Sequence, residues 1–172
     1  MVRRAKIEDL QSRLSVLIET ADEPQDDGRL IEPILGDLFR TYNIQIREDF
    51  TRRDPDSGLV LAQVDGAIEL DGIVHLVELK WLKEPLGPAD FSPQLGRLMS
   101  RPDVSGIFLS MSGYTESVIR ECAKALDRRM LFLCSLQEIS RLLLRQDDLI
   151  RFLKRKSRAA IVDRNPYLEI LG

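Results

Sequence analysis

The segment from Val64 to Trp81 predicts a β-hairpin, and this hairpin constrains the fold more than any other part of the chain. It reads V-D-G-A-I-E-L-D-G-I-V-H-L-V-E-L-K-W, with alternating apolar residues on both sides of Asp71-Gly72. Asp-Gly favours a two-residue hairpin turn because both turn positions need positive φ. If Leu70 faces Ile73 across the turn, the register pairs Ile68 with His75, Gly66 with Val77, and Asp65 with Glu78.

Charged side chains gather on one face of this hairpin. Lys80 follows Glu78 by two residues, so it points to the same face as Glu78 and Asp65. The opposite face is apolar apart from His75 and is expected to face the core; it comprises Val64, Ile68, Leu70, Ile73, Val77 and Leu79. A slip of one residue would turn the two carboxylates into the core, so this pattern determines the register.

The predicted pair of Asp65 and Glu78 places two like charges directly opposite each other. Their Cβ atoms would lie roughly 5 Å apart, which destabilises a strand pair, and Lys80 offsets one charge of the two. A divalent cation would resolve the conflict. Hard carboxylate oxygens suit Mg²⁺ or Mn²⁺, which keep several waters and leave room for a phosphate.

Asp65 followed by Glu78-Leu79-Lys80 in a strand resembles the motif of the PD-(D/E)xK nuclease superfamily, with Val64 where that name has proline. Two flanking segments resemble its Mrr-like restriction endonuclease branch. These are G-R-L-I-E-P-I-L-G-D-L-F-R-T-Y from Gly28, similar to the first helix of the branch, and P-D-V-S-G-I-F-L-S-M-S-G-Y-T from Pro102, similar to the strand and helix start after the hairpin. The likeness spans about residues 28 to 126.

The resemblance implies a metal-dependent DNA endonuclease. Asp65 and Glu78 would be metal ligands together with the backbone carbonyl of Leu79, and Glu32 would be an outer or second-metal carboxylate. Lys80 would lie beside the attacking water. The metal would be Mg²⁺, with Mn²⁺ as a substitute, because phosphodiester hydrolysis needs a cation to neutralise charge and activate water. Pro33 directly follows Glu32, so we expect the helix to begin near there, with Pro33 in its first turn.

Other functions remain open on the sequence. The motif by itself also fits a solvated strand end with an exposed acidic face. An exonuclease or a junction resolvase could use the same fold, and so could a non-catalytic assembly or regulatory module; the residues do not separate DNA from RNA as substrate. The resemblance implies restriction or antiviral defence, in which so small a chain would act as a homodimer or with a partner protein.

Composition permits this interpretation without requiring it. A chain of 172 residues with 44% hydrophobic content can form a single domain with a real core. The net charge of −3 counts against tight, autonomous DNA binding, since basic faces supply most of the non-specific affinity. Cys122 and Cys134 are too few for a disulfide framework or a zinc site, which fits a reducing compartment. No run of apolar residues is long enough to span a membrane, so we expect a cytoplasmic protein without membrane contact.

Periodicity and turn residues predict an α/β fold in which helices flank a mixed sheet, and the resemblance implies that this sheet is restriction-endonuclease-like. The expected elements are an N-terminal helix from Lys6 to Thr20, a loop over 21–28, the Glu32 helix, a strand from Ile44 to Phe50, the hairpin, a helix from Ala89 to Met99, a strand from Gly106 to Met111, a helix from Glu116 to Asp127, a strand from Met130 to Cys134, and a long C-terminal helix from Leu136 to Lys156. We divide this single nuclease domain into a helical arm (1–22), a core (28–134) and a C-terminal helix with tail (135–172).

Several further residues have a functional and a structural interpretation. We favour solvent exposure for Arg52 and Arg53, and helix capping for Ser110, Ser112 and Thr115, over contacts with phosphate. Gln94 is expected on the surface and not in the site. Core packing is favoured for His75 over a catalytic role and for Trp81 over stacking on a base. The basic run R-F-L-K-R-K-S-R from Arg151 is either a DNA contact or the carboxyl end of a helix, where cations meet the macrodipole favourably.

Overall fold

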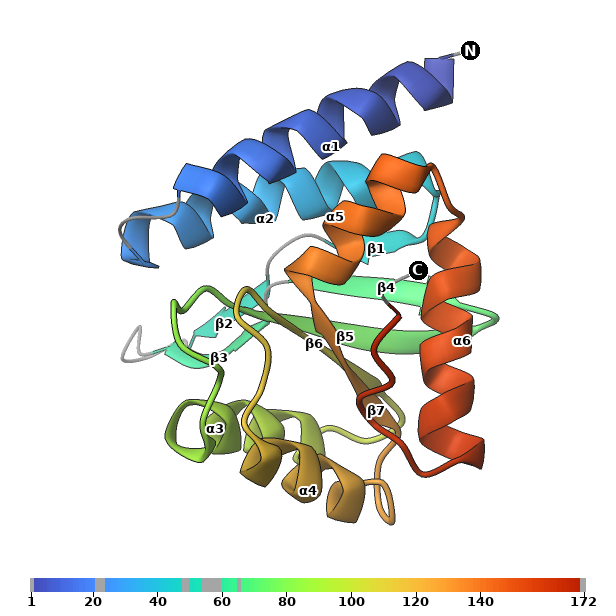
Figure 1. Cartoon of the computed structure of the whole chain (residues 1–172). Helices are drawn as coiled ribbons and strands as arrows, with labels where there is room; N and C mark the ends of the chain where they lie inside the picture. Colours follow the sequence, from blue (N-terminus) through green and yellow to red (C-terminus); the bar gives the residue numbers. More distant parts are fainter. Residues whose placement is uncertain (1, 21–23, 48–49, 54–59, 65, 171–172) are drawn as a thin grey trace.

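The computed structural model describes residues 2–20, 24–47, 50–53, 60–64 and 66–170. They form an α/β fold in which helices flank a five-stranded mixed sheet, with a helix near each end of the chain (Figure 1). This confirms the fold class predicted from the sequence. None of the described helices is both long and apolar enough to cross a membrane.

The main sheet has the strand order β1-β4-β5-β6-β7. Its strands are β1 (Gln45–Arg47), β4 (Gly66–Leu70), β5 (Ile73–Lys80), β6 (Ser105–Ser110) and β7 (Leu131–Ser135). The first three pair antiparallel, and β5, β6 and β7 pair parallel through crossover helices. The central strand β5 therefore joins the antiparallel and the parallel halves of the sheet.

A second, two-stranded sheet departs from the sequence prediction. It consists of β2 (Phe50–Arg53) and β3 (Val60–Val64), which pair antiparallel. We expected one strand over 44–50 and one running from Val64 through Leu70. Instead, β3 ends at Val64 and β4 begins at Gly66, so the chain changes sheets beside Asp65.

Helices cover both faces of the main sheet (Figure 1). On one face lie α1 (Val2–Thr20), α2 (Pro24–Thr41), α5 (Leu136–Arg145) and α6 (Leu149–Val162), which share the larger apolar core with Val77 and Leu79 of β5. On the other face, α3 (Pro88–Met99) and α4 (Glu116–Ala125) share a smaller core with Leu76 and Phe108. Alternate residues of β5 thus point into different cores.

The N-terminal helix packs on its own domain, as its short apolar stripe predicted. Ile7, Leu10 and Leu14 are buried in the larger core. These residues recur at three- and four-residue spacing, which places them on one side of the helix. Helix α1 lies along α2 and α5 (Figure 1).

The C-terminal helical segment is present, but the prediction of one helix from Leu136 to Lys156 was wrong. Helix α5 ends where Gln146 adopts a left-handed conformation (φ 57°) and its amide bonds back to the last turn. Asp148 then accepts a hydrogen bond from the amide of Arg151 and so starts α6. A left-handed residue followed by an aspartate N-cap is a complete stop and restart signal.

Candidate active site

The hairpin adopts the predicted register. Asp71 and Gly72 have φ values of 52° and 78°, as a two-residue turn of this type requires. Leu70 lies opposite Ile73, Ile68 opposite His75, and Gly66 opposite Val77. Ile73 is the exception to the expected core face, since its side chain is 49% exposed beside the turn. Asp65, predicted to lie opposite Glu78, falls outside the described residues, as does the Val64 side chain.

Glu78 is a buried carboxylate on the central strand. It is 5% exposed and points to the face covered by α3, where Leu76 packs two residues earlier. Nη2 of Arg97 lies 3.0 Å from its Oε2, which joins α3 to β5 through an ion pair. Sequence analysis missed Arg97, whose place in the last turn of a helix resembles ordinary surface charge.

Lys80 ends β5 on the same face as Glu78 and is half-buried. Its backbone carbonyl accepts a hydrogen bond from the amide of Met111, and its parallel neighbour in β6 is Ser110. Lys80 therefore lies at the carboxyl ends of the parallel strands, the edge at which open α/β sheets commonly bind ligands. The expectation that Glu78 and Lys80 share one face is consistent with this geometry.

Gln94 was expected on the surface, but it is 3% exposed. It precedes Arg97 by one turn of α3, so both side chains lie on the helix face directed at the sheet. Within the described part of the chain, no hydrogen bond to its amide group is found. Gln94 is thus a buried polar group on the same helix face as Arg97, the partner of Glu78. It was expected on the surface because its spacing from Glu78-Leu79-Lys80 differs from that in restriction-like nucleases.

Glu32 lies on α2, whose apolar residues pack on the opposite face of the sheet from α3. The expectation that this helix begins near Glu32 was wrong: α2 starts at Pro24, so the segment 24–28 is helical and Pro33 lies inside the helix. Proline at this place removes one intrahelical hydrogen bond. A role for Glu32 beside a metal stays a prediction, as does a role for the Leu79 carbonyl.

Hydroxyl groups near the carboxyl edge have structural partners. Ser110 donates to the carbonyl of Gly113 at 2.8 Å, Ser112 donates to the carbonyl of Leu82, and Thr115 caps α4 by accepting from the amide of Val118. The capping interpretation of Thr115 is confirmed. The capping interpretation of Ser110 and Ser112 was wrong. Ser110 bonds within the turn that follows β6, and Ser112 ties this turn to the segment after β5.

His75 and Trp81 are core residues, as expected. His75 is 2% exposed, and burial lowers the pKa of its ring to about 4, so it is neutral at physiological pH. Trp81 packs in the larger core with Leu79. Cys122 and Cys134 are free and buried, and burial raises the pKa of both thiols. Arg52 and Arg53 lie in β2, and their side chains fall outside the described part.

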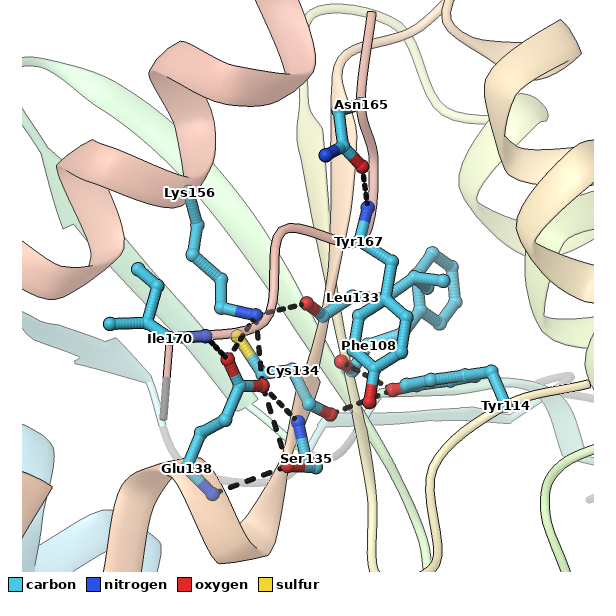
Figure 2. A network of polar contacts seen from close by, with 10 residues as sticks. All are labelled: Phe108, Tyr114, Leu133, Cys134, Ser135, Glu138, Lys156, Asn165, Tyr167 and Ile170. Carbon is cyan, nitrogen blue, oxygen red and sulfur yellow. Dashed lines mark hydrogen bonds and ion pairs between the residues drawn. The ribbon is translucent and has the colours of Figure 1, made fainter. Parts of the chain in front are cut away.

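A second buried carboxylate was not predicted. Oε1 of Glu138 lies 2.7 Å from Nζ of Lys156, and the same carboxylate accepts hydrogen bonds from the amides of Ser135 and Ile170 (Figure 2). Lys156 also donates to the carbonyl of Leu133 at 2.8 Å. The sequence did hold one signal, because Ser135 and Glu138 have the spacing of a capping box, which the structure contains.

Of the carboxylates in the described residues, two are buried, Glu78 and Glu138. The described residues contain no group of three or more histidine, cysteine, aspartate and glutamate side chains that could hold a metal ion. No protein-family model matches the chain, and no curated protein is significantly similar to it.

Proposed function

We propose that the chain is a Mg²⁺-dependent DNA endonuclease of the PD-(D/E)xK type, with Mn²⁺ as a substitute metal. The observation that carries the proposal is a buried carboxylate, Glu78, two residues before Lys80 at the carboxyl edge of the parallel strands. An ionisable group buried at a sheet edge of this kind is a candidate functional group.

The chemistry of Glu78 suits a hard divalent cation. Glu138 has Lys156 and two backbone amides on its oxygens, so it serves the fold. Glu78 instead pairs with Arg97 from a neighbouring helix, and the Arg97 side chain is 35% exposed. A carboxylate oxygen is the kind of ligand that Mg²⁺ prefers, so the cation could share this carboxylate with Arg97.

The proposed reaction is hydrolysis of a phosphodiester bond. The bound cation supplies charge neutralisation at the phosphate and lowers the pKa of water. Glu78 and Asp65 would hold it, with Glu32 and the Leu79 carbonyl as further ligands. Lys80 would orient the attacking water, and Arg97 would position the Glu78 carboxylate. A nuclease of this kind would serve in restriction or antiviral defence, as a homodimer or with a partner protein.

A second candidate function rests on the same ion pair. Arg97 neutralises Glu78 without any metal, and buried carboxylates with such partners are also purely structural. This observation favours a non-catalytic assembly or regulatory module that uses the fold. The two functions differ in one property, since only the nuclease hydrolyses nucleic acid.

Cleavage of supercoiled plasmid in Mg²⁺ or Mn²⁺ tests the proposal. We expect nicked and linear products from the wild type and none from Glu78→Ala or Lys80→Ala. Matched controls are Glu69→Ala and Lys83→Ala, which remove exposed residues of the same type near the hairpin. Covalently closed plasmid has no ends, so its cleavage also separates an endonuclease from an exonuclease. An inert wild type would contradict the endonuclease and leave the exonuclease and the non-catalytic module.

A further inference from the structure

Helices α5 and α6 enclose a cleft of about 560 Å³ that the candidate active site does not use. Leu142, Phe152 and Ile170 supply its apolar lining. Its other lining residues are charged, and cations predominate: Arg141, Arg145, Arg151, Lys154, Arg155 and Arg158 against Glu138, Asp147 and Asp148. We call this site the arginine cleft.

The positive charge of the arginine cleft is largely uncompensated. All five of its arginines are exposed, and none forms an ion pair with any other residue in the described part of the chain. Lys154 pairs with Asp71 at 2.7 Å, and Glu138 is neutralised by Lys156. Asp148 caps α6. Five arginines without an ion-pair partner beside two exposed carboxylates, Asp147 and Asp148, are a local excess of positive charge in a chain of net charge −3.

The position of these residues excludes the helix-end explanation of the basic run. Helix α6 continues to Val162, beyond Arg158, and has no basic residue in its last turn. The macrodipole acts within the last turn, so it does not account for Arg151 and Arg155 in the first half of the helix. Of the two interpretations of the basic run, a helix end or a contact with DNA, the structure therefore favours contact with an external anion.

The spacing of the arginines suits a repeating anion. Arg151, Arg155 and Arg158 follow one another at four and three residues, so they form a row about 10 Å long on one side of α6. Arg141 and Arg145 form a second row of about 6 Å on α5. Arginine binds phosphate oxygens through two parallel hydrogen bonds, which lysine does not.

We propose that the arginine cleft binds the phosphodiester backbone of a nucleic acid. Two rows of guanidiniums on the two helices that line the cleft match successive phosphates of a strand better than a single compact anion. The cleft lies on the α5 and α6 side of the sheet, whereas Glu78 faces α3. It is thus a binding surface separate from the candidate active site, and the binding does not require that the chain be a nuclease.

The test is equilibrium binding to fluorescently labelled duplex DNA and duplex RNA, in EDTA so that no cleavage occurs. The variant is Arg151→Gln/Arg155→Gln/Arg158→Gln. The matched control, Arg120→Gln/Lys124→Gln/Arg128→Gln, removes the same charge from exposed positions in and just after α4. Circular dichroism and thermal unfolding check that both proteins are folded.

We expect the cleft variant to lose at least about tenfold in affinity and its salt dependence to fall by about 2 to 3 in slope, as for three lost phosphate contacts. The control should stay within about twofold of wild type. Tight binding to either duplex with this pattern supports the proposal, and the two probes show which nucleic acid is preferred. The proposal would be overturned if both variants lost affinity equally or if the wild type bound neither duplex. It would also be overturned if the cleft bound ATP or inorganic phosphate as tightly as it binds the duplexes.

Discussion

Arg97 donates a hydrogen bond from Nη2 to Oε2 of Glu78 at 3.0 Å, and this contact ties α3 to the central strand at the candidate active site. The Glu78 side chain is almost fully buried, whereas the Arg97 side chain is partly open to solvent. A metal ion that binds Glu78 must share the carboxylate with this cation or displace it. The ion pair is therefore the point at which fold stability and the proposed metal binding meet.

Replacing Arg97 with methionine should destabilise the protein in EDTA. The buried Glu78 carboxylate would lose a charged partner, which costs about 1 to 3 kcal/mol in the free energy of unfolding. Mn²⁺ should then restore more stability to Arg97→Met than it adds to the wild type, because the cation no longer competes with a guanidinium. Urea unfolding with and without Mn²⁺ measures both effects. A variant that Mn²⁺ does not stabilise would contradict a metal role for Glu78.

Lys156 and Lys154 lie on the same helix and should behave differently. Lys156→Met leaves Glu138 buried without its counter-charge, so we expect a loss of about 3 to 5 kcal/mol in the free energy of unfolding. Lys154→Met breaks the exposed pair with Asp71 and should change stability by less than about 1 kcal/mol. Denaturant titration of the two variants gives the comparison. Equal losses would show that the buried ion pair contributes no more than a surface pair.

His75 should make the folded state sensitive to acid. Burial lowers the pKa of its ring from 6.5 to about 4, so below pH 6.5 the unfolded chain binds the proton more tightly than the folded one. The contribution of His75 to the free energy of unfolding is therefore fully present above pH 6.5. It is lost as the pH falls to 4, by up to about 3 kcal/mol. His75→Leu should remove this part of the pH dependence of unfolding. An unchanged difference in stability between pH 7 and pH 4 would exclude His75 as its source.

The hairpin and its register were predictable because several local signals agree. Asp71-Gly72 determines the turn type, and the apolar alternation on both strands determines which side chains meet the core. The helices and strands between Trp81 and Leu136 were also found, because each is bounded by turn or capping residues. Thr115, for example, caps α4 with its own side chain.

The errors have physical causes. Pro33 suggested a helix start, but α2 tolerates it in its interior because tertiary packing of residues such as Ile31 and Leu35 outweighs one lost hydrogen bond. The break at Gln146 was missed because the apolar periodicity of α5 and α6 runs on across it. The switch between sheets beside Asp65 depends on pairing with distant strands, which no local pattern contains.

The candidate site was predictable only in part. Glu78 and Lys80 follow from the spacing on one strand, whereas Arg97 and Gln94 reach that strand from a helix that the chain forms later. In the sequence, a charged and a polar residue on this helix fit a solvent-exposed face as well as they fit a face directed at the sheet. The buried pair of Glu138 and Lys156 was missed for the same reason, since a lysine beside apolar residues of a helix usually extends its charged end into solvent.

Binding of Mn²⁺ to the wild type and to Glu78→Gln tests the central claim most directly. Glutamine keeps the shape of the side chain and an oxygen for Arg97, but it removes the charge that a cation requires. Calorimetric titration should show Mn²⁺ binding to the wild type and to the exposed-carboxylate control Glu69→Gln, with binding lost in Glu78→Gln. Equal binding by all three proteins, or none by the wild type, would contradict a metal-dependent active site at Glu78.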